Sequence, residues 1–311
     1  MKLMKNKTSR FCHCGSRKKY RDCCGRELRH EGKGIAILNA ERIPVCNFNC
    51  STDCAEWCCG GATLITMDEI KNCYDMLPIT IGFRKYLPMS VKHRDFLRTV
   101  GFMSDRFYMV GDFIAGNRHG KRCRALGSDN LCVLHKEKRK PRQCQIVPFC
   151  ALYPEDLQDI IFMDQEHSKF SNCKGFKSPR ETDFAVWKEG RFTDPLIRNA
   201  FYGYQRGLQR QRPIMQSILR TLEGQRAYEE FHKGEGILEV YIPAPQLFAV
   251  LDEAGFSMEE SHHFLSVQGR LCYDELTKKR TENPVLRDYL SALNKTAELY
   301  AAFIKNKKLF H

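Results

Sequence analysis

The chain has 311 residues, 42% of them hydrophobic, and a formal net charge of +13, which is enough material for two domains plus a small appended module. No uninterrupted apolar stretch reaches the roughly 20 residues of a membrane-spanning helix. The N-terminal residues Met1–Lys7 lack the apolar core of a secretory signal. We therefore expect a cytoplasmic protein with no membrane association.

Sixteen cysteines dominate the composition. In a reducing cytosol, closely spaced cysteines point to metal or redox chemistry rather than to disulfides. We therefore expect thiolates that hold metal.

Two basic runs overlap the cysteines. Residues 1–33 hold eleven Lys or Arg against three acids, and residues 117–142 hold nine against two. A Zn²⁺ ion or a four-iron cluster held by four thiolates carries about two negative charges, so the bases can act as counter-charge. We favour this interpretation over nucleic acid binding, because no aromatic-rich RNA-reading motif or zinc-finger His pair accompanies the bases.

The first cysteine group lies at the N-terminus, in a segment too short to bury a hydrophobic core. Two cysteines one residue apart precede a Gly-Ser turn, and a vicinal pair follows eight residues later, giving Cys12, Cys14, Cys23 and Cys24. Metal would supply most of the folding free energy of such a loop. Four thiolates in tetrahedral geometry predict a structural zinc.

This stretch resembles the SEC-C motif, which ends the preprotein translocase ATPase SecA and is appended to many bacterial proteins. The resemblance covers about fifteen residues, including Gly15-Ser16 and Lys19-Tyr20, and departs at His13, where the motif usually has proline. It implies a zinc-bound tag over residues 1–33 that docks a protein partner.

The second group begins with cysteines at four-residue intervals and a vicinal pair, namely Cys50, Cys54, Cys58 and Cys59. Asp53 with Glu56 suggests a helix start and Gly60-Gly61 a stop, so a short helix over 54–59 is expected.

The remaining cysteines of this group come later in the chain, at Cys123, Cys132, Cys144 and Cys173. The turn formers Gly127-Ser128-Asp129-Asn130 predict a β-hairpin that brings Cys123 and Cys132 close together. A turn and a short helix are expected around Cys144.

These eight cysteines resemble the CxxCxxCC or YkgJ-like family of zinc- or iron-chelating proteins. The resemblance spans roughly 130 residues and includes Leu134-His135, Pro141-Arg142 and Pro148-Phe149. The three-residue gaps at the front are also seen in the flagellin lysine N-methylase branch, for which the family implies an iron–sulfur cluster. Two zinc ions, two four-iron clusters, or one cluster with spare thiols all fit the eight thiolates.

That branch raises the possibility of S-adenosylmethionine as a cofactor. The chain has no G-x-G-x-x-G motif after a strand, and Cys50-x3-Cys54-x3-Cys58 is one residue longer than the C-x3-C-x2-C of radical S-adenosylmethionine enzymes. We therefore place methyl transfer behind metal binding.

Other residues carry weaker signals. Cys46 and Cys150 are either spare ligands or, as we favour, buried thiols, while Cys73 and Cys272 are expected in the core. His135 is either a ligand or a hydrogen-bond donor to a sulfur. A capping signature at Thr66–Ile70 predicts a helix, and Phe107–Val110 predicts a strand.

Beyond residue 178 the pattern becomes helical. Asp194-Pro195 predicts a helix to about Arg212 and Pro213 the start of another. A short strand is expected from Gly236, followed by helices over 244–254, 257–279 and 283–308.

The sequence thus predicts an α+β protein with a zinc module at 1–33, a cysteine-cluster domain at 34–178 and a helical domain at 179–311. We expect a metal-binding bacterial protein, with zinc in the first module and zinc or an iron–sulfur cluster in the second. The alternatives are an iron–sulfur-dependent lysine N-methylase and a non-catalytic zinc adaptor that recruits a protein partner.

Overall fold

The computed structural model describes residues 42–43, 45–48, 62–104, 107–116, 123–167, 173–177, 185–234, 237–240, 242, 244–278 and 298. These residues combine helices with antiparallel sheets, as the expected α+β class requires. The N-terminal module and the expected helices over 54–59 and 283–308 lie outside the described residues.

The central element is a five-stranded antiparallel sheet, in which β2, β5, β3 and β8 lie in that order and β4 also pairs with β5. The strands are β2 (Thr63–Ile65), β3 (Ile79–Tyr86), β4 (Phe102–Met103), β5 (Tyr108–Ala115) and β8 (Ile237–Val240). Between β3 and β5 the register is continuous from Ile79 opposite Ala115 to Tyr86 opposite Tyr108. The expected strands at 107–110 and after Gly236 are confirmed.

Side chains alternate across this sheet and build two cores, as the period of two in a strand dictates. Phe83 and Phe113 belong to the first core, which η3 (Met67–Asn72), α8 (Arg226–Lys233), α9 (Ala244–Glu253) and α10 (Met258–Lys278) also line. Val110 and Ile114 belong to the second core, lined by α3 (Val91–Val100), α5 (Arg142–Ile146) and α6 (Gln158–His167). The sheet is therefore covered on both faces.

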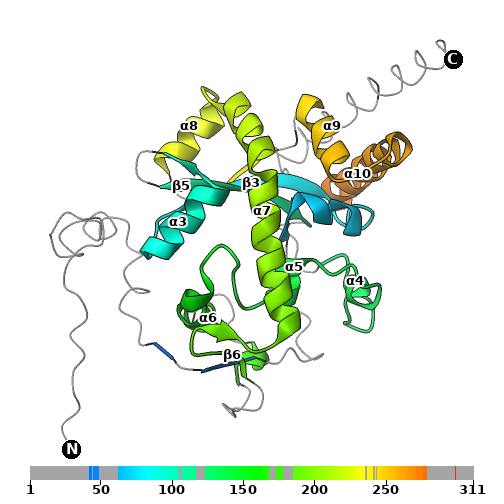
Figure 1. Cartoon of the computed structure of the whole chain (residues 1–311). Coiled ribbons are helices and arrows are strands. Elements are labelled where there is room, and N and C mark those ends of the chain that lie inside the picture. Colours follow the sequence, from blue (N-terminus) through cyan, green and yellow to red (C-terminus); the bar gives the residue numbers. More distant parts are fainter. Residues whose placement is uncertain are drawn as a thin grey trace, which may run out of the picture.

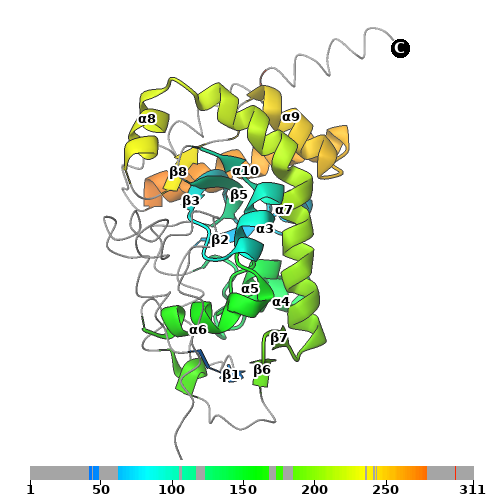
Figure 2. The ribbon, with the colours of Figure 1, turned by 60° about the vertical axis from the view of Figure 1, so that its left-hand side comes forward.

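One long helix, α7 (Pro195–Leu222), joins the two cores. Its first half contributes Phe201 and Tyr204 to the second core, and its second half contributes Met215 and Ile218 to the first. Figures 1 and 2 show α7 running along the molecule from β6 to the region of α8 and α9. Asp194 caps its start, with its side chain accepting a hydrogen bond from the backbone of Leu196.

The expected break at Pro213 is wrong, because the helix continues through this residue. Proline removes one helical hydrogen bond, but its ring can face solvent, and Pro213 is exposed. Leu208 and Met215 lie seven residues apart, about two helical turns, and both are buried on the face of α7 that packs toward the sheet. That shared apolar stripe keeps the two halves in line.

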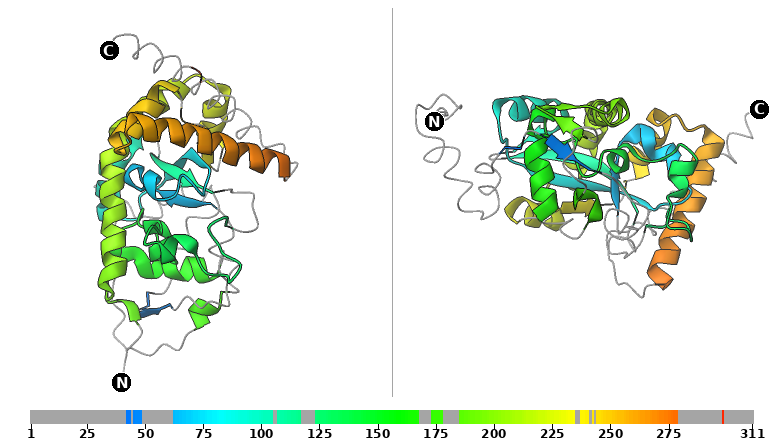
Figure 3. Two further views of the ribbon diagram at one scale, coloured as in Figure 1. Left: turned by 90° about the vertical axis from the view of Figure 1, so that its right-hand side faces the viewer. Right: turned by 90° about the horizontal axis from the view of Figure 1, so that it is seen from below.

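A second, small sheet contains β1 (Val45–Asn47), β6 (Ala185–Lys188) and β7 (Arg191–Phe192), all antiparallel. It lies at the end of the molecule opposite α10, as the left view of Figure 3 shows. Each of the two sheets therefore contains strands from before residue 178 and from after it. In the small sheet β6 pairs with β1, and in the larger sheet β8 pairs with β3. The segments before and after that residue pack into shared cores.

Short helices complete the described fold: α4 (Val133–Lys136), η4 (Glu155–Leu157) and η5 (Lys174–Lys177). The predicted short helix near Cys144 is α5, and α9 and α10 match the helices expected over 244–254 and 257–279. No described helix has both the length and the apolar character needed to cross a membrane.

Candidate metal centre

Cys123 and Cys132 lie on the two sides of a tight chain reversal. The backbone N–H of Gly127 donates to Leu131 and that of Val133 donates to Ala125, both at 2.8 Å, and Leu126 forms an antiparallel bridge with Cys132. The chain therefore reverses where a β-hairpin was predicted, but the described reversal contains one isolated bridge and no paired strands.

Turn chemistry explains why the chain reverses here. The Asp129 side chain accepts a hydrogen bond of 3.0 Å from the backbone of Leu131, and Asn130 has a φ of 60° in the left-handed region that asparagine tolerates. The result is a tight loop in which Leu126 pairs with Cys132, while Cys123 lies three residues before that bridge.

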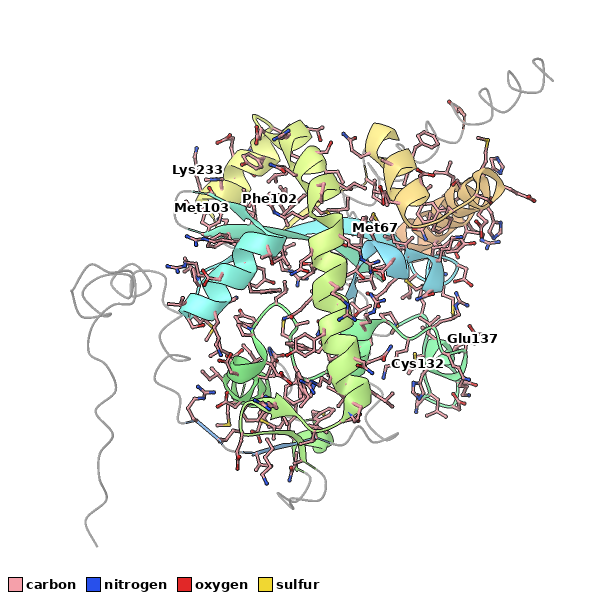
Figure 4. The ribbon with its side chains drawn as sticks, in the orientation of Figure 1. Met67, Phe102, Met103, Cys132, Glu137 and Lys233 are labelled. Carbon is pink, nitrogen blue, oxygen red and sulfur yellow. The ribbon has the colours of Figure 1, made fainter. Side chains whose placement is uncertain are left out.

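This loop packs on the first core. Ala125 and Leu134 are each 1% exposed, and Cys123 and Cys132 pack against the same cluster while staying half-buried. Figure 4 labels Cys132 and Glu137, which flank the two ends of α4, at the edge of the molecule. The cysteines therefore combine an anchored backbone with partial access to solvent.

Cys144 approaches from a different segment, the helix α5. Glu69 holds the start of this helix, with its carboxylate accepting a hydrogen bond of 2.6 Å from the backbone of Arg142. The Arg142 guanidinium in turn donates to Thr66 at 3.1 Å and to Asp68 at 2.8 Å. Through these contacts η3 fixes the position of Cys144.

The Cys144 thiol donates a hydrogen bond of 3.1 Å to the hydroxyl of Thr63 on β2. The pKa of Cys144 is raised to about 12, chiefly by burial and in smaller part by Cys123 and Cys132, while the hydrogen bond to Thr63 and the charge of Lys140 act to lower it. An electrostatic effect from both cysteines requires that they lie near Cys144. Cys123, Cys132 and Cys144 are therefore close enough to interact electrostatically.

The fourth described ligand candidate, Cys173, lies in the second core, where it is 6% exposed. Cys46 is fully buried in the same cluster and half-buried Cys150 packs against it. Across the described ranges, no three His, Cys, Asp or Glu side chains are arranged so that they could hold a metal ion. The described thiols are therefore divided between the two cores and do not by themselves form a complete metal site.

The remaining predicted ligands lie outside the described residues: Cys12, Cys14, Cys23, Cys24, Cys50, Cys54, Cys58 and Cys59. The side chain of Cys272 also lies outside them.

The structure also describes two other residues that the sequence singled out, His135 and Cys73. His135 is exposed, and its backbone N–H bonds to the carbonyl of Cys132 at 3.1 Å. Cys73 is fully buried in the first core, as expected, and its thiol donates to the carbonyl of Glu69 at 3.7 Å.

Sequence reasoning did not identify Thr63 or Lys140 as neighbours of Cys144. Thr63 lies 81 residues away from Cys144, and no local pattern links the two. Lys140 belongs to the basic run that was expected to stabilise anionic sulfur, so the charge pattern indicated a part of its role near Cys144.

Comparisons with protein-family models, with curated proteins and with solved structures find no match for this chain.

Proposed function

We propose that this is a metal-binding protein whose central domain holds zinc or an iron–sulfur cluster through cysteine thiolates. The ligands are drawn from Cys50, Cys54, Cys58, Cys59, Cys123, Cys132, Cys144 and Cys173, and a separate structural zinc uses Cys12, Cys14, Cys23 and Cys24. The observation that supports this most directly is that Cys123 and Cys132 flank one chain reversal packed on the first core, near enough to Cys144 to influence its pKa.

The environment of Cys144 explains why a cation suits this place. Burial disfavours an isolated thiolate, and so the thiol is protonated at neutral pH. A bound metal replaces the proton and favours the thiolate, so that metal uptake and proton release are coupled. The positive charge of Lys140 acts in the same direction.

Covalent connectivity supplies a second argument. Cys59 precedes Thr63 by four residues, and a fully extended chain of that length spans at most about 14 Å. The vicinal pair Cys58-Cys59 is therefore tethered to the residue whose hydroxyl contacts Cys144. This brings an additional pair of thiols within reach of the described three.

The test is the metal content of Cys144→Ser, purified without oxygen. Serine can still donate a hydrogen bond to Thr63, but it does not provide a thiolate. We expect the central metal to be lost and the N-terminal zinc to be retained. Iron with sulfide and visible absorption in the parent protein identifies a cluster, whereas a colourless protein with zinc identifies zinc sites.

Cys150→Ser is the matched control, because burial also raises the pKa of Cys150, to about 11, but this residue packs against the second core. We expect full metal content in this variant. Unchanged metal in Cys144→Ser, in a protein with a native circular dichroism spectrum, contradicts the proposal.

A further inference from the structure

The solvent-exposed side of α7 carries arginine and no acidic residue. The helix Pro195–Leu222 contains five arginines and neither Asp, Glu nor Lys. Four of these arginines are exposed, and we call them the arginine face: Arg198, Arg206, Arg210 and Arg220. The helix contains no cysteine and lies outside both basic runs of the sequence, so counter-charge to metal thiolates does not account for this face.

The four arginines lie on one side of the helix. At 3.6 residues per turn and 1.5 Å per residue, they fall within an arc of roughly 120° and extend over about 33 Å. The same arc holds exposed polar side chains without charge: Asn199, Gln209 and Ser217. Figure 2 and the left view of Figure 3 show α7 along an outer edge of the molecule. The arginine face is therefore a continuous polar row that a large partner can reach.

This pattern does not favour the stability of the helix itself. Arg206 and Arg210 are four residues apart, where like charges repel each other. Arg198 lies near the N-terminal end of α7, where the helix dipole favours acids over bases. A helix face that serves only solubility usually mixes charges of both signs. The arginine face therefore suggests a role other than the folding of α7.

Three of the four arginines are available for a partner. In the part of the chain that the structure describes, neither Arg206 nor Arg220 forms an ion pair. Arg210 donates to Asp68 at 3.0 Å, and its side chain is still 63% exposed. Asp68 also accepts from Arg142 at 2.8 Å, so Asp68 keeps a cationic partner when Arg210 turns away.

The other two arginines of α7 differ from each other. Arg198 lies 4.0 Å from Glu155, which also accepts a hydrogen bond of 2.6 Å from the hydroxyl of Tyr202. Arg198 can therefore turn toward solvent while Glu155 retains a donor. Arg212, by contrast, donates to the backbone of Gly101 at 3.1 Å, so it stabilises the fold and is not part of the face.

We propose that the arginine face binds the phosphate backbone of duplex DNA. Guanidinium groups match phosphate oxygens with two parallel hydrogen bonds, and neutral amides and hydroxyls also donate to phosphates. The length of the row, about 33 Å, is close to one turn of the duplex, about 34 Å. A lipid surface fits less well, because the apolar side of α7 is buried in the two cores and is not available for insertion.

The experiment measures the fluorescence anisotropy of a labelled DNA duplex of about 20 base pairs, titrated with the full chain at several salt concentrations. We expect binding at low salt and an affinity that falls linearly on logarithmic axes as salt rises. Polyglutamate, which represents an acidic protein partner, should compete poorly at equal charge. No binding of the duplex, or equally strong competition by polyglutamate, would overturn the proposal.

The informative variant is Arg206→Gln combined with Arg220→Gln, because glutamine keeps these exposed positions polar and helical. We expect the affinity at low salt to fall by about tenfold or more, and the salt dependence to decrease by about two phosphate contacts. Lys233→Gln combined with Arg270→Gln is the matched control, since it removes the same charge from exposed positions on α8 and α10. The control should bind as the parent does.

Two results with this pair of variants contradict the proposal, provided that circular dichroism shows native folding. One is parent-like affinity of the Arg206 and Arg220 variant. The other is an equal loss in the control, which would mean that only the total charge matters.

Arg206→Lys combined with Arg220→Lys separates charge from geometry. Lysine keeps the positive charge but not the planar fork of donors. We expect the salt dependence of the parent with a lower affinity than the parent. A salt dependence as low as that of the glutamine variant would show that the charges at these positions do not contact phosphate.

Discussion

The carboxylate of Glu69 holds the backbone of Arg142, 73 residues further along the chain, through a hydrogen bond of 2.6 Å. The same carboxylate accepts from the backbone and the hydroxyl of Thr66, at 2.9 and 2.8 Å. Glu69 therefore closes the start of η3 and the start of α5 at once, and it fixes the helix that carries Cys144.

Replacing Glu69 with alanine should destabilise the protein by about 3 kcal/mol, because three hydrogen bonds to a charged, buried group are lost together. Urea unfolding measures this loss. Asp68→Ala is the control, since Asp68 is more exposed and pairs with Arg142 and Arg210. It should cost about 1 kcal/mol. Equal losses in the two variants would show that Glu69 has no special role.

Gly207→Ala should also destabilise the protein, although alanine is the better helix former by about 1 kcal/mol. A Cβ at this position on α7 would lie 2.6 Å from the Cβ and Cγ2 of Thr66, which belongs to the capping box. Overpacking of this kind costs about 1–3 kcal/mol, so we expect a net loss. Thermal and urea unfolding would measure it.

Asn199→Ala tests the same helix at an exposed position. There, helix propensity acts alone, and a gain of a few tenths of a kcal/mol is expected. Stabilisation of both variants would mean that α7 and η3 do not approach as closely as described.

Pro213→Ala should raise the free energy of unfolding. Proline inside a helix costs about 3 kcal/mol relative to alanine, and Pro213 lies exposed within α7. Part of that cost is recovered in the unfolded state, where proline restricts the chain. We expect a net gain of about 1–2 kcal/mol in urea unfolding. A loss would indicate that the proline sets a bend on which the packing of α7 depends.

His93 should make the protein less stable in mild acid. Burial lowers the pKa of His93 to about 4, while an unfolded chain has a histidine pKa of about 6.5. Between these values the unfolded state binds the proton first, so stability falls as the pH drops from about 6.5 to about 4. The full effect is on the order of 3 kcal/mol.

The measurement is urea unfolding of the parent and of His93→Gln across this pH range. The parent should lose stability more steeply than the variant. Parallel curves would mean that His93 is protonated as easily in the native state as in the unfolded one.

Local patterns predicted the features that depend on neighbouring residues. Thr66 and Glu69 signalled the start of η3, and the turn formers at 127–130 signalled the reversal between Cys123 and Cys132. Each depends on contacts within a few residues, which the sequence displays directly.

Contacts between distant segments were not predictable in this way. Gln211, which is 1% exposed, accepts from the backbone of Met67 and donates to that of Gly111, both at 2.9 Å. Gln268 plays a similar part, accepting from the backbone of Ile79 at 2.8 Å. From the sequence alone, a glutamine in an amphipathic helix is expected at the surface, because the distant segment that it contacts is not known.

The continuity of α7 through Pro213 also depends on contacts between distant segments. Local propensity favours a break, and tertiary burial of Met215 and Ile218 against the sheet overrides it. For the cysteines, spacing suggested a shared centre, while the location of Cys173 in the second core depends on how the sheets pack.

The pairing of β8 with β3 has a consequence for biosynthesis. Ile237–Val240 covers an edge of β3 that was made about 150 residues earlier. During translation, therefore, the N–H and C=O groups along that side of β3 have no strand partner until α7 and α8 have emerged. Nascent chains that stop before this point present an open edge to other chains, which favours aggregation and recognition by chaperones.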